Sequence, residues 1–390
     1  MSFNTYDLLW LLLPLAAGSG WLVARFDQKR HAAARDLPSA YFKGLNFLLN
    51  EQPDKAIEVF IQALEVNSET VETHLALGNL FRRRGEVERA IRIHQNLIAR
   101  PTLDKNQRSQ ALLELGQDYL KAGLFDRAEN LFLELAEIRL HNEQALRFLR
   151  HIYQQEKEWH NAILTCRKLA RVAGKNFNDV IAQYYCELAE EAFAAKNLSQ
   201  SREFIKKALS SDPNCAHASI LLGDIEAEEG RHKDAIKAWK RIEEQDPLYL
   251  GEVAGRLSSS FRQLNDDAGM YQFFEDALQR QGGVMLMLAL ADVIESRDGK
   301  KAAEDFVAKW LRRQPSVQGL HRLIQLHLVH AGESVKEQLQ LLQGIIERIL
   351  DQQYGYVCQV CGFKGKSLYW QCPGCNRWNT IKPTVGEVAD

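Results

Sequence analysis

The chain has 390 residues and a formal net charge of −2 at pH 7. Its length suits several ordinary domains or one elongated array, and its near-neutral charge excludes a global positive field that recruits nucleic acid. Helix-forming residues dominate and there are only 9 prolines, so we expect a mostly helical fold. The sequence offers no nucleophile–base pair, phosphate-binding loop or open metal site, and an enzyme is therefore the least favoured class.

The first element is an apolar run of 17 uncharged residues, Leu8–Ala24. This is the lower end of the length that a helix needs to cross the hydrocarbon core of a bilayer. Trp10 and Trp21 lie near its two ends, where amphipathic rings favour the membrane interface. We therefore predict a transmembrane anchor over residues 1–24.

The charges around this run predict its orientation. The basic residues Arg25, Lys29, Arg30 and Arg35 follow it, and none precedes it. The positive-inside rule therefore places the rest of the chain in the cytoplasm, with residues 25–40 as a juxtamembrane linker. A cleaved signal peptide normally carries Lys or Arg before its apolar run, which disfavours that alternative. A buried soluble helix is the other alternative.

An internal repeat extends from residue 41 to residue 350. In one unit a small residue, Gly78, is followed by a large apolar residue, Phe81, and then by Ala90. The Ala-type position recurs at steps of 33 to 39 residues, at Ala56, Ala90, Ala128, Ala162, Ser201, Ala235, Met270 and Ala303. Such a period indicates pairs of helices that bury their apolar faces only by stacking on neighbouring pairs. An unrelated helical bundle is the alternative, but a bundle has no reason to hold a fixed period.

This pattern resembles the tetratricopeptide repeat. The match is strongest in the first three units and over residues 223–247, whereas Arg150, Ala189 and Ser258 replace the small glycine elsewhere. We expect about eight helical pairs, with residues 319–350 as a ninth or capping pair. The predicted fold class is all-α: a tetratricopeptide-repeat superhelix with an N-terminal transmembrane helix and a small C-terminal rubredoxin-like metal ribbon.

The concave surface of such an array is lined by the first helix of each pair, and it usually binds a peptide or another protein. Asn79 and Arg83 face this groove if the unit has ordinary repeat geometry. Together with Arg82 they are candidates to bind a carboxylate of a partner. The alternative is that this arginine run is a solvated helix end placed favourably against the helix macrodipole.

Four of the 7 cysteines form two Cys-x2-Cys pairs near the carboxyl end. The candidate metal ligands are Cys358, Cys361, Cys372 and Cys375. Four thiolates on two tight turns are what tetrahedral sulfur coordination requires, and Gly362 leaves room for backbone N–H groups to point at sulfur. We predict one four-cysteine-bound metal ion, zinc or iron, because sulfur ligands accept both. Disulfides are the alternative, and a cytoplasmic location argues against them.

Residues 354–385 are too few for an independent core, so the metal has to stabilise this segment. The two cysteine pairs resemble the knuckles of rubredoxin. The loop between them is far shorter than in electron-transfer rubredoxins, which favours a structural ribbon over an electron carrier. Trp370 and Trp378 are candidates for a partner-binding surface, and the alternative is that they dock the ribbon onto the repeats.

The order of anchor, repeats and rubredoxin-like ribbon is itself distinctive. Over essentially its whole length the chain resembles the lipopolysaccharide assembly protein B family. The segments that carry the resemblance are Leu11–Pro14, Gly44–Leu49, Leu77–Arg82, Arg84–Val87, Arg89–Gln95, Leu368–Pro373 and Thr380–Pro383.

The resemblance implies properties that the periodicity alone does not. Proteins of this family are inner-membrane proteins of Gram-negative bacteria with a cytoplasmic repeat domain and a ribbon that packs on the repeats. The resemblance therefore implies a non-enzymatic adaptor that restrains lipopolysaccharide synthesis. Its implied partners are the membrane-bound protease FtsH and its substrate LpxC, the deacetylase at the committed step of lipid A synthesis.

Three other functions remain as alternatives. The first is a scaffold for other lipopolysaccharide assembly or transport proteins, and the second is a rubredoxin-type electron carrier. The third is a nucleic-acid-binding ribbon, because Lys364, Lys366, Arg377 and Lys382 make the tail mildly basic. The predicted anchor and the neutral array argue against nucleic acid. The sequence leaves open the native metal and the oligomeric state, including a homo-oligomer.

Overall fold

A computed structural model of the chain describes residues 46–47, 55, 71–101 and 103–384. The chain divides into two compact units, one ending at Ala145 and the other beginning at Leu146. The predicted anchor over residues 1–24, the linker over residues 25–40 and most of the first repeat unit lie outside the described residues. Within the part that the structure does describe, no helix has both the length and the apolar character needed to cross a membrane.

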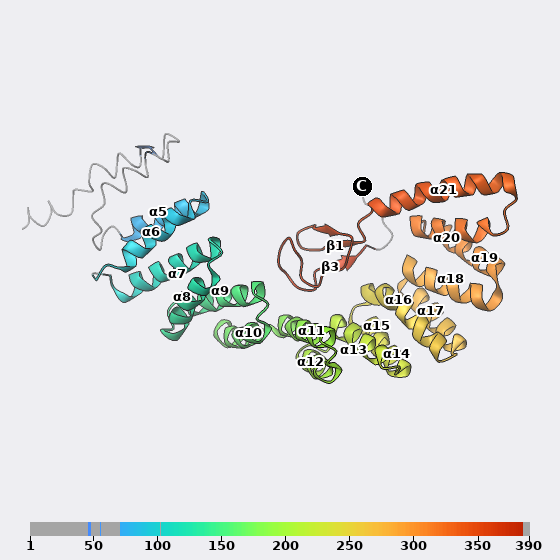
Figure 1. Ribbon diagram of the computed structural model, residues 1–390, viewed down its shortest axis with the longest axis horizontal. Coiled ribbons are helices and arrows are strands. Elements are labelled where there is room, and N and C mark those ends of the chain that lie inside the picture. The colour runs from blue at the N-terminus through green and yellow to red at the C-terminus, as the bar shows by residue number, and fades with distance from the viewer. Residues whose placement is uncertain (1–45, 48–54, 56–70, 102, 385–390) are drawn as a thin grey trace, which may run out of the picture. The chain divides into compact units, whose positions relative to one another are not determined.

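The first unit consists of helical pairs in which each helix packs against the next one along the chain (Figure 1). Its helices are α5 (Val71–Arg83), α6 (Val87–Ile98), α7 (Lys105–Lys121) and α8 (Phe125–Glu137). Asp104 caps α7 through a capping box with Gln107, in which each side chain accepts a hydrogen bond from the other residue's backbone N–H.

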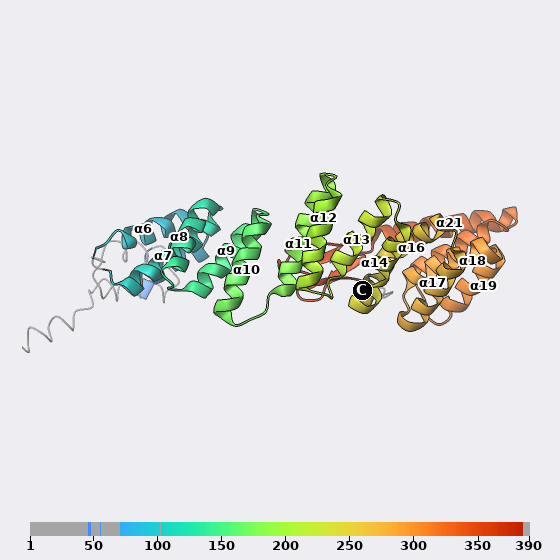
Figure 2. The same ribbon diagram turned by 90° about the horizontal axis from the view of Figure 1, so that it is seen from below.

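The boundary between the units falls within α9 (Asn142–Gln155), and the second unit continues the pairing (Figure 2). Its helices are α10 (Trp159–Ala173), α11 (Asn178–Ala194), α12 (Leu198–Ser211), α13 (Ala216–Glu228), α14 (His232–Lys240), α15 (Ile242–Gln245), the 3-10 helix η1 (Pro247–Tyr249), α16 (Leu250–Gln263), α17 (Asp267–Gln281), α18 (Val284–Asp298), α19 (Lys300–Leu311), α20 (Val317–Leu328) and α21 (Glu333–Gln352). The poorly matching residues 319–350 thus lie in a final pair, α20 and α21, whose helices contact each other.

The repeats that keep the glycine pack it, on their first helix, against a large residue of their second helix. A Cβ atom added at Gly223 would lie 2.2 Å from Nε1 of Trp239, which is buried. The same substitution at Gly116 would bring Cβ to 2.6 Å from the ring of Phe132. Real Cβ atoms do not approach other atoms this closely, so these positions hold glycine because the helices cross in contact there.

The turn inside each pair also repeats. A residue with positive φ recurs at the same place in successive units, five residues before the Ala-type position, at Gly85, Gly123, Lys157, Lys196, Gly230 and Asn265. Glycine adopts this left-handed conformation without steric cost, whereas lysine does not. The degenerate units therefore keep the turn geometry of the repeat even where they have lost its glycine.

After α21 the chain forms a small antiparallel sheet with the strand order β2–β1–β3. Its strands are β1 (Tyr356–Cys358), β2 (Lys364–Gly365) and β3 (Ile381–Pro383). In the register, Tyr356 of β1 lies opposite Gly365 on one side and Pro383 on the other. The observed fold is thus a mostly helical repeat array that ends in a ribbon, and the ribbon contains the four clustered cysteines.

Candidate metal centre and its contact with the repeats

The four cysteines of the ribbon bring their sulfur atoms together. All four Sγ atoms lie within 4.8 Å of one another. The Sγ atoms of Cys358 and Cys375 are 3.8 Å apart, and those of Cys361 and Cys372 are 3.6 Å apart. A metal bound tetrahedrally at about 2.3 Å from each sulfur gives sulfur–sulfur edges of about 3.8 Å. The cluster therefore has the size of a tetrahedral four-thiolate site, which zinc and iron both fit.

Two matching turns position these sulfur atoms. The residue after each second cysteine adopts a left-handed conformation, with φ of 74° at Gly362 and 55° at Asn376. In the first turn the backbone N–H of Val360 donates to Sγ of Cys358 over 3.4 Å. Donors of this kind stabilise the thiolate form that a metal requires. Gly362 is thus the turn residue that the sequence predicts, and Asn376 fills the equivalent place without glycine.

The polar surroundings of Cys358 favour its ionisation. Burial alone would raise its pKa, but a hydrogen bond between its sulfur and the side chain of Thr380, together with hydrogen bonds from the backbone N–H groups of Cys361 and Val360, outweighs this effect. They lower the pKa of Cys358 to about 6. Among these neighbouring thiols Cys358 therefore ionises first, while the pKa values of Cys361 and Cys372 are raised, so a bound cation would be needed to hold all four as thiolates. The donor set, the spacing and the local hydrogen bonds therefore all fit a structural metal ion.

The ribbon lies against the repeats of its own chain, and Trp378 is one of its two aromatic anchors. The Trp378 ring lies edge-on to Tyr184 of α11 and to Trp159 of α10, with centroid distances of 5.6 Å and 6.1 Å. Gln154, which is buried, accepts a hydrogen bond from Tyr184 over 2.8 Å and one from Nε1 of Trp378 over 3.4 Å. The indole thus occupies an aromatic site whose polar atom has a partner.

Trp370 is the second anchor. Its ring stacks on the imidazole of His217 in α13, and it also contacts Tyr249 at a centroid distance of 5.0 Å. Trp370 and Leu368 pack against the main hydrophobic core of the second unit. The ribbon is therefore continuous with the core of the repeats.

Polar contacts at the edge of the ribbon fix its register on the array. Nζ of Lys382 lies 2.5 Å from Oδ2 of Asp246, and both side chains are largely buried. The hydroxyl group of Tyr249 lies 2.8 Å from the carbonyl oxygen of Ile381. On the neighbouring strand, the hydroxyl of Tyr356 donates to Glu252 over 2.8 Å. Ion pairs and hydrogen bonds of this kind require one orientation, so they specify how the ribbon docks.

Beneath Trp370, the buried His217 contacts two polar side chains of α11, of which Gln183 is buried and Glu190 is exposed. Its Nε2 lies 2.8 Å from a carboxylate oxygen of Glu190, and its Nδ1 lies 3.0 Å from the side-chain oxygen of Gln183. Burial lowers the pKa of His217, although the Glu190 carboxylate acts in the opposite direction. One turn before Glu190 on the same helix, burial and the nearby Glu190 charge raise the pKa of Glu187 to about 7. Burying the charged carboxylates of Glu187 and Glu190 below the ribbon therefore costs free energy unless they stay solvated or are paired with a hydrogen-bond partner.

The structure places the predicted groove residues of the first unit in a network between two repeats. Arg82 contacts Asp118 over 2.8 Å and Glu114 over 2.6 Å, both on α7. Arg82 also donates to the side-chain oxygen of Asn79 over 2.7 Å, while Arg83 is exposed. Asp118 is fully buried, and its carboxylate is compensated by the Arg82 guanidinium and by a second hydrogen-bond partner on α6. Asn79 and Arg82 are thus engaged within the chain, and their assignment to a partner stays a prediction.

The second hydrogen-bond partner of Asp118 in this network is a residue that sequence reasoning passed over. His94 is fully buried on α6, and its Nδ1 lies 2.5 Å from Oδ2 of Asp118. It occupies the place that Phe132 and Trp239 fill in other repeats, opposite the glycine of the first helix. In the sequence, a histidine at a repeat position that is otherwise apolar could have predicted that this side chain has a buried acidic partner.

The docking surface on the repeats was also absent from the sequence prediction. It combines residues from separate helices, namely Gln154, Trp159, Tyr184, His217, Asp246, Tyr249 and Glu252. Trp370 and Trp378 lie against this surface of their own chain, as the docking alternative expected. Whether they also bind another protein stays a prediction.

Comparisons with known proteins agree with the architecture. A family model described as a rubredoxin metal binding domain matches residues 356–383, and tetratricopeptide-repeat models match residues 73–109 and 186–249. Lipopolysaccharide assembly protein B of Escherichia coli strain K12 is 39% identical over 383 residues, covering 97% of this chain and 98% of the relative. The protein of the same name from Haemophilus influenzae is 37% identical over 393 residues, covering 98% of this chain and 99% of the relative. With identity of this level along both chains, the protein belongs to the lipopolysaccharide assembly protein B family.

Proposed function

We propose that the protein is a membrane-anchored cytoplasmic adaptor without catalytic activity of its own. In this proposal it restrains lipopolysaccharide synthesis by presenting the deacetylase LpxC to the protease FtsH in the bacterial inner membrane. Family membership supports the link to lipopolysaccharide. The observation that carries the adaptor role is the docking of a four-cysteine ribbon on tetratricopeptide repeats, because it builds a composite surface of the kind that binds other proteins.

The ribbon supplies the outer part of that surface. Its contacts occupy the first-helix side of the repeats at Tyr184, His217 and Glu252. Val360 and Tyr369 of the ribbon are left 48% and 44% exposed. An exposed aromatic and an exposed aliphatic side chain on one small ribbon are suitable anchors for another protein. The metal then acts on partner binding indirectly, by holding the ribbon folded.

The predicted anchor supplies proximity. An adaptor and a protease confined to one bilayer meet at a far higher effective concentration than two proteins in solution, without any additional contact. We expect that removal of residues 1–24 leaves a folded protein that binds LpxC but regulates it poorly. A chimera in which an unrelated single-pass transmembrane segment replaces residues 1–24 tests whether the anchor acts only by proximity or also through specific contacts of its own. Restored control of LpxC levels by that chimera supports proximity, and control by the unanchored protein contradicts it.

The decisive experiment is affinity capture of the full-length protein from detergent-solubilised native membranes. The matched variants are Cys372→Ser with Cys375→Ser, which removes two ligands, and Gln359→Ser with Lys364→Ser, which changes two exposed ribbon residues and keeps all four ligands. We expect FtsH and LpxC with the intact protein and the control, and their loss with the ligand variant. Absence of both partners from the intact sample would overturn the proposal.

The name of the relatives favours a second candidate function. Both are called assembly proteins, which suits a scaffold for other proteins of lipopolysaccharide assembly or transport. The same capture experiment distinguishes the two functions. Recovery of such proteins in place of FtsH and LpxC supports the scaffold. A reversible one-electron potential in freshly purified protein would instead support an electron carrier.

A further inference from the structure

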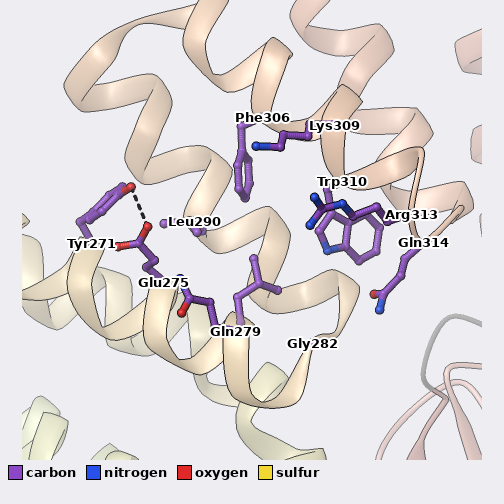
Figure 3. A pocket seen from close by; sticks show the side chains of 11 residues that line it. Tyr271, Glu275, Gln279, Gly282, Leu290, Phe306, Lys309, Trp310, Arg313 and Gln314 are labelled. Carbon is purple, nitrogen blue, oxygen red and sulfur yellow. Dashed lines mark hydrogen bonds between the residues drawn. The ribbon is translucent and has the colours of Figure 1, made fainter.

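The second unit carries a cavity that the docked ribbon does not use. It has a volume of about 540 Å³ and lies between α17 and α19, the second helices of two successive pairs (Figure 3). Leu290 of α18, which is buried, contributes to its lining from the first helix of the later pair. The cavity therefore opens on the second-helix side of the array, whereas the ribbon contacts first helices such as α11, α13 and α16.

The walls of this cavity form an elongated groove. Tyr271, Glu275 and Gln279 line it from α17 at intervals of four residues, so that wall extends over about 12 Å of helix. Phe306 and Trp310 line it at the same interval from α19. A groove of this length accommodates about three or four residues of an extended peptide, at about 3.3 Å for each residue.

Charge is distributed unevenly along the groove. Lys309 and Arg313 line it from α19 and the turn that follows, both are exposed, and neither forms an ion pair with any described residue. In Figure 3 Lys309, Trp310 and Arg313 are grouped toward one end of the groove, and Tyr271 and Glu275 lie toward the other. The hydroxyl of Tyr271 donates to the carboxylate of Glu275 over 3.2 Å, which satisfies one acceptor but leaves its negative charge. The lining thus has two cationic side chains, Lys309 and Arg313, and one carboxylate, so its formal net charge is positive.

We propose that this groove binds a short extended peptide segment of a partner protein, in which an apolar side chain lies next to a carboxylate. The apolar side chain packs on Phe306 and Leu290, where burial of apolar surface supplies affinity. The carboxylate pairs with Lys309 and Arg313, where charge-assisted hydrogen bonds supply specificity. This site is separate from the ribbon and from the concave surface, so it does not depend on which proteins the ribbon engages.

A panel of labelled peptides tests the proposal on the full-length protein in lipid nanodiscs. Each fluorescein-labelled pentapeptide has glycine at both ends and, at its three central positions, one Glu or Asp, one Leu, Phe or Trp, and one Ser. A second panel replaces the acid by its amide, and a third replaces the acid by Lys. We expect fluorescence anisotropy to show binding of acidic peptides that is at least about ten-fold tighter than binding of the matched amides.

Charge reversal then locates the site. The variant Lys309→Glu with Arg313→Glu is expected to weaken the acidic peptides at least about ten-fold and to strengthen the lysine peptides. Arg312→Glu is the matched control, because Arg312 is exposed beside Arg313 but does not line the groove. Circular dichroism confirms that the variants are folded. Equal binding of acid and amide peptides, an equal effect of Arg312→Glu, or no binding by any acidic peptide would each overturn the proposal. So would equally tight binding of N-acetylglutamate alone, which would identify a site for small anions.

Discussion

The indole ring of Trp370 stacks on the imidazole ring of His217, with a centroid distance of 4.1 Å and an interplanar angle of 11°. This contact joins the metal ribbon to α13 in the middle of the second unit. Both rings are held from other sides, since Glu190 hydrogen bonds to His217 and Tyr249 contacts Trp370. The orientation of the ribbon is therefore determined by the repeats as well as by the ribbon's own short strands.

Substitution of Trp370 by alanine is expected to loosen the ribbon from the array. Loss of a large aromatic side chain from a packed site costs about 3–5 kcal/mol, and we expect about 2–3 kcal/mol here because Trp370 is only half-buried. Tyr369→Ala is the control, because Tyr369 is its neighbour and is 44% exposed. Urea denaturation measures the free energy of unfolding. An equal loss in both variants would contradict the docking role of Trp370.

Removal of the metal is expected to unfold the ribbon and to expose its docking surface. A structural zinc ion contributes on the order of 10–16 kcal/mol to the folding of a small module, more than a segment of this size obtains from its core. Hydrogen exchange before and after chelation measures the change. We expect lost protection over residues 356–383 and reduced protection around His217 and Tyr249. Unchanged protection in α5 to α8 is the internal control, and unchanged protection at His217 would argue against coupling.

Substitution of Glu187 by glutamine is expected to stabilise the protein at alkaline pH. The pKa of Glu187 is raised by burial from its ordinary value of 4.5 to about 7, so the folded state retains a proton that the unfolded state loses. The free energy of unfolding therefore falls as pH rises from about 4.5 to 7. The loss is at most about 1.4 kcal/mol for each unit by which the pKa of Glu187 is raised. Glutamine removes this loss because it cannot ionise.

The measurement for this change is urea denaturation of both proteins at pH 5 and pH 8. We expect Glu187→Gln to gain about 1–3 kcal/mol over the unsubstituted chain on going from pH 5 to pH 8. Glu203→Gln is the control, because Glu203 is exposed on α12 and the pKa of its carboxyl is lowered by Lys207. A pH-independent difference between the two proteins would show that Glu187 ionises normally.

Alanine at Gly223 is expected to disrupt its repeat, although alanine is the better helix former. The new Cβ would meet the buried ring of Trp239 at 2.2 Å, so the two helices would have to move apart. Overpacking of this kind costs about 1–3 kcal/mol. Gly255→Ala is the control, because Gly255 is also helical and a Cβ atom added there would have no neighbouring atom within 4 Å. Thermal unfolding is expected to show destabilisation for the first variant and a gain of up to about 1 kcal/mol for the second.

The substitution Lys157→Gly is expected to stabilise the turn between α9 and α10. Lys157 has φ of 59°, a conformation that costs about 1–2 kcal/mol for a residue with a side chain. The gain is expected to be near 1 kcal/mol, because glycine also increases the entropy of the unfolded chain. Lys168→Gly, in the middle of α10, is expected to destabilise by about 1 kcal/mol and serves as the control. Equal effects of both variants on thermal unfolding would refute the account.

The sequence predicted those features that recur along the chain or lie close together in it. The Ala-type positions recur with the period of the repeat, and each one from Ala90 to Ala303 is at most 1% exposed. The four metal ligands occupy two local turns, so their spacing alone predicted the cluster that the structure contains. Periodicity and short-range spacing are physical constraints on neighbouring residues, and single sequences record them directly.

Contacts between distant segments could not be predicted in this way. Gln154 and Trp378 meet across 224 residues, and nothing in either neighbourhood marks the other as a partner. Tyr184 and His217 occupy helix positions that in isolation indicate only a buried face. The left-handed turn at Lys157 was equally hidden, because the sequence signal for such a turn is glycine and the conformation is imposed there by the packing of the repeat.

In an array in which each repeat contacts only its neighbours, small rotations between successive repeats can add up to bending and twisting of the whole array. The ribbon changes this behaviour locally, because a single small module contacts α11, α13, η1 and α16 together. Those helices can no longer rotate past one another without breaking the same few contacts. We therefore expect a metal held by the four cysteines to stiffen the middle of the second unit, so that force applied to the array strains the flanking repeats first.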